Sequence, residues 1–209
     1  SWSLVYRRKI GIMGGTFDPV HLGHLIIAEA ALDAAGLDEV RFVPCGRPYF
    51  KDERCDKVSD AEDRLEMCRL AVNDNPRFTV SDIEVKRRGK TYTYETMEEL
   101  KAGEPDSEFS FICGADSVVS MSRWYLPERI FRACSILAAV RDDETDRKCF
   151  DTEIKKLHHE YGADISFLPV PNIGISSTDI RERIKSGKSV RYLTMNNVME
   201  YIERKGLYR

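Results

Sequence analysis

Two glycines, and then two histidines three residues apart, lie close together near the start of the chain. The segment reads Gly14-Gly15-Thr16-Phe17-Asp18-Pro19, followed by His21-Leu22-Gly23-His24. Glycines let a ligand approach main-chain N–H groups closely, and residues three apart share one face where a helix begins. Imidazoles can donate hydrogen bonds or carry positive charge. The spacing therefore predicts that His21 and His24 border an anion site, with phosphate as the expected ligand.

Hydroxyl side chains gather in a second segment near the C-terminus, which reads Ile175-Ser176-Ser177-Thr178-Asp179-Ile180-Arg181. One hydroxyl of such a run caps a helix, which is its usual role, while the other two stay near exposed N–H groups. Arg181 is close enough in the sequence to reach the same volume and bind an anion. Because the run follows a strand expected in the same sheet as Gly14, it predicts a second phosphate-binding corner.

A strand and a helix must position the first of these segments. An apolar run from Ile10 leads into the glycines, and an Ala/Leu/Ile-rich stretch ends at Gly36. This is the pattern of a buried strand, a tight turn and a helix, and we expect the glycines in the turn itself. The helix then directs its unpaired N–H groups and the positive end of its dipole at the turn.

The rest of the chain alternates between strand and helix patterns. Alternating apolar residues predict short strands at 78–80 and 83–85, and Ser59 with Glu62 predicts a helix capping box. Longer apolar runs predict buried strands at 39–44, 109–114, 135–140 and 165–169.

At 209 residues, the chain is long enough for one well-buried α/β domain and too short for two. Within a single domain of residues 1–209, we expect a Rossmann-like, doubly wound parallel sheet at about 9–172 and a small C-terminal helical subdomain at about 173–209. Ligands of such sheets lie beyond the carboxyl ends of the strands. Gly114 and Asp116 are then expected beside the first glycines, where Asp116 can accept hydrogen bonds from ribose hydroxyls.

The composition is that of an ordinary soluble protein, with 42% hydrophobic and 32% charged residues and a formal net charge of -3. This balance predicts no broad binding to nucleic acid or to a membrane. No apolar run is long enough to span a bilayer and no signal-peptide core is evident, so we expect a cytoplasmic location. In a cytoplasmic chain, six cysteines without a CxxC pair predict reduced thiols and no cysteine-built metal site. A homo-oligomer is compatible with the sequence. A dinucleotide dehydrogenase is disfavoured, because the strand expected at 39–44 ends without the required acidic residue.

Both polar segments resemble the signatures of the nucleotidylyltransferase superfamily. The run Gly14 to Pro19 with His21-x-Gly-His24 is similar to the first signature, and Ile175 to Arg181 is similar to the second. Their order and separation make the resemblance specific. Five further parts of the chain resemble the nicotinate mononucleotide adenylyltransferase branch, and they are 59–67, 91–96, 114–117, Trp124 and 201–208.

This resemblance implies that the adenylyl group of ATP is transferred to nicotinate mononucleotide. The products would be nicotinate adenine dinucleotide and pyrophosphate, in NAD biosynthesis, with Mg²⁺ held mainly by ATP phosphates and water and with no metal-ligating side chain. The catalytic residues implied are His21, His24 and Arg181. The ATP-binding residues implied are Gly14, Gly15, Thr16, Phe17, Gly114, Asp116, Ser177 and Thr178. The mononucleotide-binding residues implied are Lys51, Tyr92, Thr93, Trp124, Arg141 and Asn172.

One loop departs from the family, because Pro48-Tyr49-Phe50-Lys51 stands where the family has a Pro-Pro-His-Lys run. This departure motivates one alternative, a nucleotide-binding regulator without turnover, and a sister adenylyltransferase or cytidylyltransferase is the other. The acid form of the mononucleotide is expected to be preferred over the amide. The reason is that no acidic side chain is evident in the sequence to receive the amide N–H groups.

Overall fold

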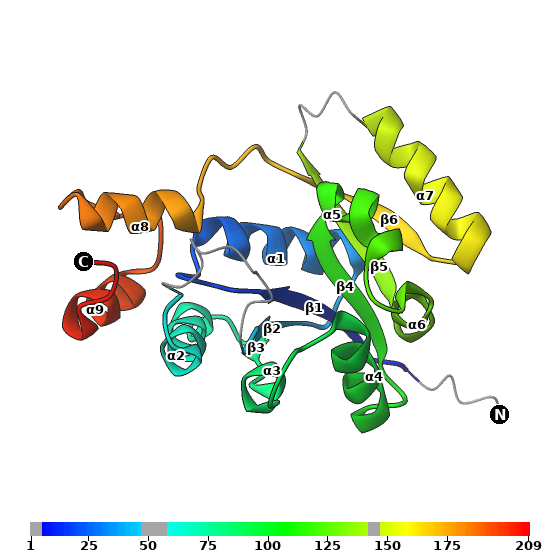
Figure 1. Cartoon of the computed structure of the whole chain (residues 1–209), viewed down its shortest axis with the longest axis horizontal. Coiled ribbons are helices and arrows are strands. Elements are labelled where there is room, and N and C mark those ends of the chain that lie inside the picture. The colour runs from blue at the N-terminus through cyan, green and yellow to red at the C-terminus, as the bar shows by residue number, and fades with distance from the viewer. Residues whose placement is uncertain (1–5, 47–57, 142–146) are drawn as a thin grey trace.

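The computed structural model describes residues 6–46, 58–141 and 147–209. Its centre is a six-stranded sheet in the order β3-β2-β1-β4-β5-β6, and all neighbouring strands run parallel (Figure 1). This is the doubly wound order in which the topology reverses between β1 and β4, as the sequence predicted. The strands are β1 (Lys9–Gly15), β2 (Glu39–Pro44), β3 (Phe78–Val80), β4 (Glu108–Gly114), β5 (Ser135–Arg141) and β6 (Ile165–Val170).

Helices connect the strands and cover both faces of the sheet. They are α1 (Leu22–Ala35), α2 (Ala61–Val72), α3 (Ile83–Lys86), α4 (Thr93–Gly103), α5 (Ala115–Ser120), the 3-10 helix η2 (Met121–Arg123), α6 (Pro127–Ala133), α7 (Arg147–Tyr161), α8 (Ser177–Lys185) and α9 (Asn196–Lys205).

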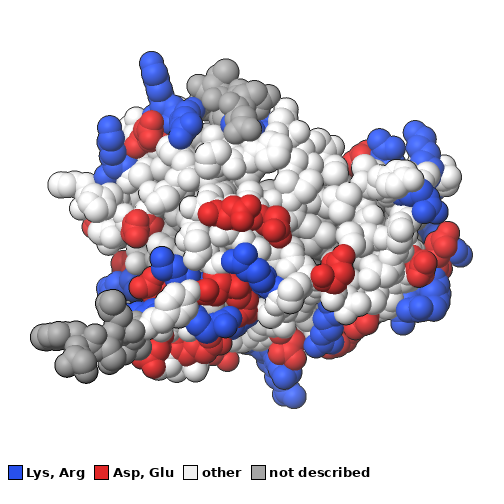
Figure 2. Space-filling model, turned by 180° about the vertical axis from the view of Figure 1, so that it is seen from behind, with Lys and Arg blue, Asp and Glu red and all other residues white. Residues whose placement is uncertain are grey.

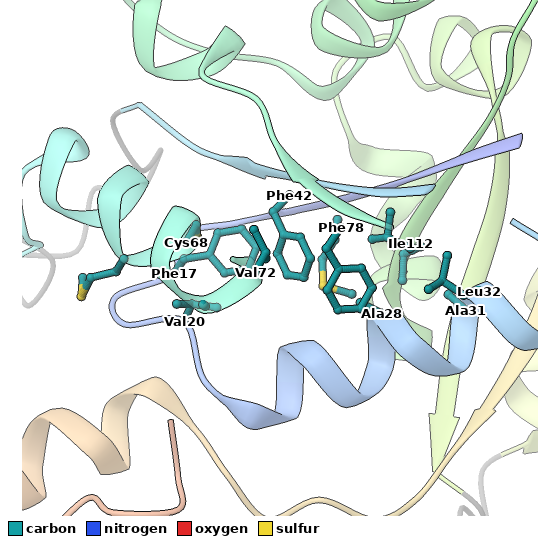
Figure 3. Close-up of a cluster of buried hydrophobic side chains, with 14 of the residues drawn as sticks. Phe17, Val20, Ala28, Ala31, Leu32, Phe42, Cys68, Val72, Phe78 and Ile112 are labelled. Carbon is teal, nitrogen blue, oxygen red and sulfur yellow. The ribbon is translucent and has the colours of Figure 1, made fainter. Parts of the chain in front are cut away.

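The two faces of the sheet bury two separate hydrophobic clusters, because successive side chains of a strand point to opposite faces. Ile10 and Ile12 of β1 pack in the cluster that includes α4, α5, α6 and α7. Met13 packs in the other cluster, with α1, α2 and α9. Figure 3 shows part of this second cluster, in which Phe17 and Phe42 lie together under α2. Since both faces are covered, we expect a ligand beyond the carboxyl ends of the strands, as in other open parallel sheets.

The C-terminal helical part is tied to the turn between β1 and α1. Thr194 donates its hydroxyl to the carbonyl of Val20 at 2.8 Å, and the amide of Leu22 donates to the carbonyl of Leu193 at 2.9 Å. The Tyr208 hydroxyl donates to the carboxylate of Asp18, a residue that is 3% exposed. Burial beside this carboxylate raises the pKa of Tyr208. The last residues of the chain therefore help to fix the turn between β1 and α1, which contains Asp18.

Three local predictions from the sequence are wrong. Residues 83–85 lie in a helical turn rather than a strand, because β3 ends at Val80 and Lys86 bonds back to Asp82 through its amide at 2.9 Å and its ammonium group at 3.1 Å. Three alternating residues are too few to distinguish these structures. The capping box at Ser59 is absent, because α2 begins after Asp60 and no side chain caps it. The paired glycines belong to β1 and not to the turn.

Acidic and basic side chains are interspersed over the face of the molecule seen in Figure 2. This distribution agrees with a small net charge of -3. Within the described residues, no helix has both the length and the apolar character needed to cross a bilayer.

Replacing Tyr208 by phenylalanine should lower the free energy of unfolding by about 1–3 kcal/mol, because the buried carboxylate of Asp18 loses a donor. Urea denaturation measures this change. Tyr192→Phe is the control, since Tyr192 is 79% exposed, and its unfolding midpoint should equal that of the unmodified protein. Equal midpoints for both variants would show that other contacts alone hold the chain end.

Candidate active site

The carboxyl end of β1 forms one wall of the site. Gly14 and Gly15 pair with Val43 and Pro44 of β2, so the main chain stays extended up to Gly15. The left-handed conformation that reverses the chain falls on Phe17, whose φ is +53°. Phe17 is buried, with its ring 4.8 Å from that of His24 in an edge-to-face arrangement. Phe17 therefore reverses the chain with its main chain and supports the turn with its buried ring.

His21 and His24 together cap the start of α1. His21 Nδ1 accepts the amide of Gly23 at 3.1 Å, and His24 Nδ1 accepts the amide of His21 at 3.1 Å. The two ring centroids are 3.8 Å apart. A Cβ at residue 23 would lie 2.8 Å from His21 Cε1, so glycine is needed there to make room for the ring. The prediction that the two histidines share one face is confirmed.

The caps determine how the two histidines can act. Because each Nδ1 accepts a main-chain N–H, the proton of each neutral ring must sit on Nε2. Burial lowers the pKa of His21 to about 4. Burial, with repulsion from His21, lowers the pKa of His24 to about 3. In the free protein, both rings are thus neutral donors at physiological pH, and neither contributes a positive charge.

The second polar segment lies directly against the first turn, although about 160 residues separate them (Figure 1). Ser177 donates its hydroxyl to the carbonyl of Pro19 at 2.8 Å. Arg181 Nη1 donates to the carbonyl of Asp18 at 2.9 Å, and Nη2 donates to the Thr178 hydroxyl at 3.3 Å. Ser176 caps α8 by accepting the amide of Asp179 at 3.1 Å, as predicted. The fold therefore brings both predicted anion-binding segments to one corner.

A cavity of about 470 Å³ opens at the ends of β1 and β4, and we call it the β1–β4 cavity. Of the residues predicted for the site, six line it, and they are Gly14, Gly15, Thr16, Thr93, Gly114 and Trp124. The Trp124 indole N–H donates to the Ser120 hydroxyl at 3.3 Å, and its ring meets that of Phe111 edge-to-face at 6.2 Å. These contacts hold a flat aromatic surface at the cavity wall. The cavity has the size and lining of a small-ligand site.

Other predicted residues do not line this cavity. Asp116 is exposed in the first turn of α5, Arg141 is exposed at the end of β5, and Asn172 is exposed after β6. Tyr92 packs its ring against Tyr125, with the centroids 4.8 Å apart. Lys51 and the divergent Pro48 to Lys51 run lie outside the described residues.

Comparison with known proteins decides the family. A family model described as cytidylyltransferase-like matches residues 12–183, which include both polar segments. The chain belongs to the cytidylyltransferase-like family. This family assignment agrees with the sheet order and with the corner formed by α1 and α8.

Within the family, the chain groups with nicotinate-nucleotide adenylyltransferases. A relative from Lachnoclostridium phytofermentans is 43% identical over 96% of this chain and 99% of its own length. One from Dehalococcoides mccartyi is 41% identical over 96% of this chain and 97% of its own length. Both are named "probable nicotinate-nucleotide adenylyltransferase". The chain is therefore a nucleotidyltransferase of this branch.

Solved structures of the branch have the same fold. The Plasmodium falciparum nicotinic acid mononucleotide adenylyltransferase complexed with NaAD has a TM-score of 0.78 at 19% identity, over 97% of this chain and 98% of its own. The same enzyme complexed with APC has a TM-score of 0.76 over the same shares of the two chains. This similarity confirms the predicted α/β, Rossmann-like fold.

Arg64, which supports the loops of the site without lining the cavity, was not among the residues predicted from the sequence. Its guanidinium, in a residue only 1% exposed, donates to the carbonyls of Thr16 at 2.9 Å, Cys45 at 2.7 Å, Gly46 at 2.5 Å and Ser59 at 2.9 Å. It therefore joins the loops after β1 and β2 to the start of α2. Its spacing from Cys68 and Ala71, on the apolar face of α2, was the signal that it is buried.

Glu84 of α3 was also missed, and it lines the β1–β4 cavity. Its carboxylate accepts the hydroxyl of Thr96 at 2.9 Å. Burial raises its pKa to about 7, although the hydrogen bond from Thr96 and the charge of Arg87 both lower it. The expectation that no acidic side chain reaches this region was therefore wrong. No signal in the sequence could have located Glu84, because its place in the cavity depends on the contact of α3 with Thr96 of α4.

The ring nitrogen signals of His21 and His24 should show the neutral Nε2–H form in the free protein from pH 7.5 to pH 5.5. The reason is that both pKa values lie at about 4 or below. Long-range ¹H–¹⁵N spectra measure this directly, with His21→Asn and His24→Asn variants to assign the signals. A ring of this pair that gains its proton between pH 7 and pH 6 would contradict the geometry of the caps.

Proposed function

We propose that this protein transfers the adenylyl group of ATP to nicotinate mononucleotide, with pyrophosphate as the second product. The observation that carries the proposal is the junction of α8 with the β1–α1 turn, through Ser177 and Arg181, beside a cavity that holds Trp124. The names of the relatives at 41% and 43% identity support the same substrates. In this proposal, the corner binds the phosphates and the adjoining cavity, with its aromatic wall, binds the pyridine ring.

The corner suits the triphosphate of ATP. His21 and His24 offer Nε2–H donors, and Arg181 supplies a permanent positive charge. The start of α8 adds the Thr178 hydroxyl and free main-chain N–H groups. At the strand ends, Gly14, Gly15 and Thr16 carry little side-chain bulk, which lets the nucleotide lie close to the main chain. Asp116, at the start of α5, is placed to accept hydrogen bonds from a ribose.

The cavity suits the mononucleotide. Trp124 can stack on the pyridine ring, and the Thr93 hydroxyl lies in the same wall. Tyr92 adjoins Thr93 in the chain, and we assign it to the rim of this site. Arg141 and Asn172, at the ends of β5 and β6, are proposed to reach the mononucleotide phosphate from the exposed side.

The transfer needs positioning and charge stabilisation more than proton removal. A phosphate oxygen of the mononucleotide is already anionic, so it attacks the α-phosphorus without a general base. The new P–O bond forms as the bond from the α-phosphorus to the bridging oxygen of pyrophosphate breaks. Negative charge grows on the leaving group and on the α-phosphoryl oxygens. We assign its stabilisation to the His24 Nε2–H and the Arg181 guanidinium.

Mg²⁺ is the metal that we propose for this reaction. Carried by the phosphate oxygens of ATP, it would neutralise charge on the triphosphate. Among the described residues, no three His, Cys, Asp or Glu side chains come together as a metal site. The corner offers donors for phosphate oxygens rather than carboxylates for a metal, and this chemistry fits an ion carried by the substrate.

We place the reaction in the cytoplasm. The described cysteines, Cys45, Cys68, Cys113, Cys134 and Cys149, are free thiols, and such thiols are usual in a reducing compartment.

Release of pyrophosphate tests the function. The protein is incubated with ATP, Mg²⁺ and either nicotinate mononucleotide, nicotinamide mononucleotide or the phosphate acceptors of sister enzymes. The highest kcat/KM is expected for nicotinate mononucleotide. A higher value for another acceptor would favour a sister transferase. Binding of ATP with no release from any acceptor would favour a regulator without turnover.

Replacing His24 by alanine should lower kcat by about 10²- to 10³-fold and raise KM for ATP much less, because its contact is made mainly to charge that develops in the transition state. Steady-state kinetics measure both constants. His24→Asn keeps an acceptor near the Nδ1 position that caps α1, whereas His24→Gln places an amide donor near the Nε2 position. A better kcat for His24→Gln than for His24→Asn is expected, and an unchanged kcat with a raised KM would assign His24 to ground-state binding.

A further inference from the structure

Glu84 is the only Asp, Glu, Lys, Arg or His side chain among the described residues that line the β1–β4 cavity. The short helix α3 is pressed against the loop after β2, where a Cβ on Gly46 would lie 2.6 Å from the Glu84 carbonyl oxygen. The main chain of Glu84 is therefore held in place on this side. Among the described lining residues, the mononucleotide proposed for this cavity would meet the acidic group of Glu84 and no basic side chain.

A directed hydrogen-bond chain orients the Glu84 carboxyl group. Arg87 Nη1 donates to Thr96 Oγ1 at 2.9 Å, and Thr96 Oγ1 donates to Glu84 Oε2 at 2.9 Å. Thr96 Oγ1 thus accepts from the arginine, and in this arrangement its own proton points to Glu84 Oε2. Oε2 is thereby occupied, and no side chain or amide in the described part of the chain bonds Oε1. A proton on Glu84 would therefore sit on Oε1, where it is available to a ligand.

The surroundings of Glu84 affect the equilibrium between its protonated and ionised forms in opposite directions. Arg87 faces it through Thr96, but Arg87 is also paired with Glu99 of α4 at 2.6 Å and lies 3.9 Å from Glu95 of α4. From the loop after β2, the Cys45 thiol faces the same wall, and burial raises its pKa. On the side of α2, the Arg64 guanidinium is bound to the Gly46 carbonyl. Burial nevertheless raises the pKa of Glu84 to about 7.

We propose that Glu84, by holding or losing a proton, determines the selectivity between carboxylate and carboxamide on the pyridine ring of the mononucleotide. A protonated Oε1 can donate to a carboxylate, whereas an ionised carboxylate repels it. An ionised Glu84 can instead accept an amide N–H. Binding of nicotinate mononucleotide therefore takes up a proton at Glu84, and binding of nicotinamide mononucleotide does not require one. The inference rests on the proposed function and adds a specificity-determining residue to it.

The test is the ratio of kcat/KM for nicotinate mononucleotide to that for nicotinamide mononucleotide, between pH 6 and pH 8 at saturating ATP and Mg²⁺. Both substrates carry the same 5′-phosphate, so its titration cancels in the ratio. A carboxyl group with a pKa of about 7 is about nine-tenths protonated at pH 6 and about one-tenth at pH 8. The ratio should thus fall at least about tenfold in the unmodified protein, and further if the ionised form favours the amide. It should stay constant in Glu84→Gln, which cannot ionise and keeps the Thr96 hydrogen bond.

Glu99→Gln is the matched control, because Glu99 binds the same arginine from outside the cavity. It should keep the fall in the ratio. Titration calorimetry in two buffers of different ionisation enthalpy gives an independent readout. At pH 7, nicotinate mononucleotide should take up about half a proton more with the unmodified protein than with Glu84→Gln.

A fall with pH that persists in Glu84→Gln, or a ratio that is constant in the unmodified protein, would overturn the role of Glu84. Pyrophosphate release from nicotinate mononucleotide would in that case still support the proposed function. If the unmodified protein released pyrophosphate with neither mononucleotide, the proposed function itself would be refuted, and the selectivity role would be refuted with it.

Discussion

The site depends on satisfying three consecutive main-chain carbonyls in the buried turn from Asp18 to Val20. Each accepts a hydrogen bond from a side chain of the C-terminal part, and the donors are Arg181, Ser177 and Thr194. A buried carbonyl without a donor costs about 1–3 kcal/mol, so the turn is stable in this form only with the C-terminal helices in place. The Asp18 carboxylate extends the dependence, because it accepts from Tyr208 and from the amide of Ser59. One turn thus joins the two anion-binding segments and α2.

Burial in this site drives basic and acidic groups alike toward their neutral forms. It lowers the pKa values of His21 and His24 and raises that of Glu84, because desolvation always disfavours the charged form. For the anion binding proposed here, the site offers mainly oriented neutral donors and few permanent charges. Arg181 provides one charge at the corner. The guanidinium of Arg64 lies behind the glycines, where it donates to four carbonyls of described residues.

The two halves of the site differ in how they are built. The corner at α1 and α8 is assembled from main-chain N–H groups, caps and hydroxyls, so its geometry follows from the helix ends. The β1–β4 cavity is lined at the strand ends by side chains of α3, α4 and α5 and by Trp124, which follows η2. We propose that the first half recognises phosphate. We propose that the second half discriminates between pyridine substituents, because Thr96 connects Arg87 to Glu84 there.

The sequence by itself determined the α/β class, the parallel sheet and most strand and helix positions, and it predicted the two polar segments as anion-binding, because these follow from local periodicity and from glycine and hydroxyl spacing. It also indicated that His21 and His24 share a face. Only the tertiary structure decided that Phe17 rather than a glycine makes the turn, which carbonyls Arg64 binds, and that Glu84 enters the cavity. These features depend on contacts between segments far apart in the chain, such as the Arg64 contact with Thr16. No local pattern encodes them, because the burial and the hydrogen-bond partners that define them come from other elements.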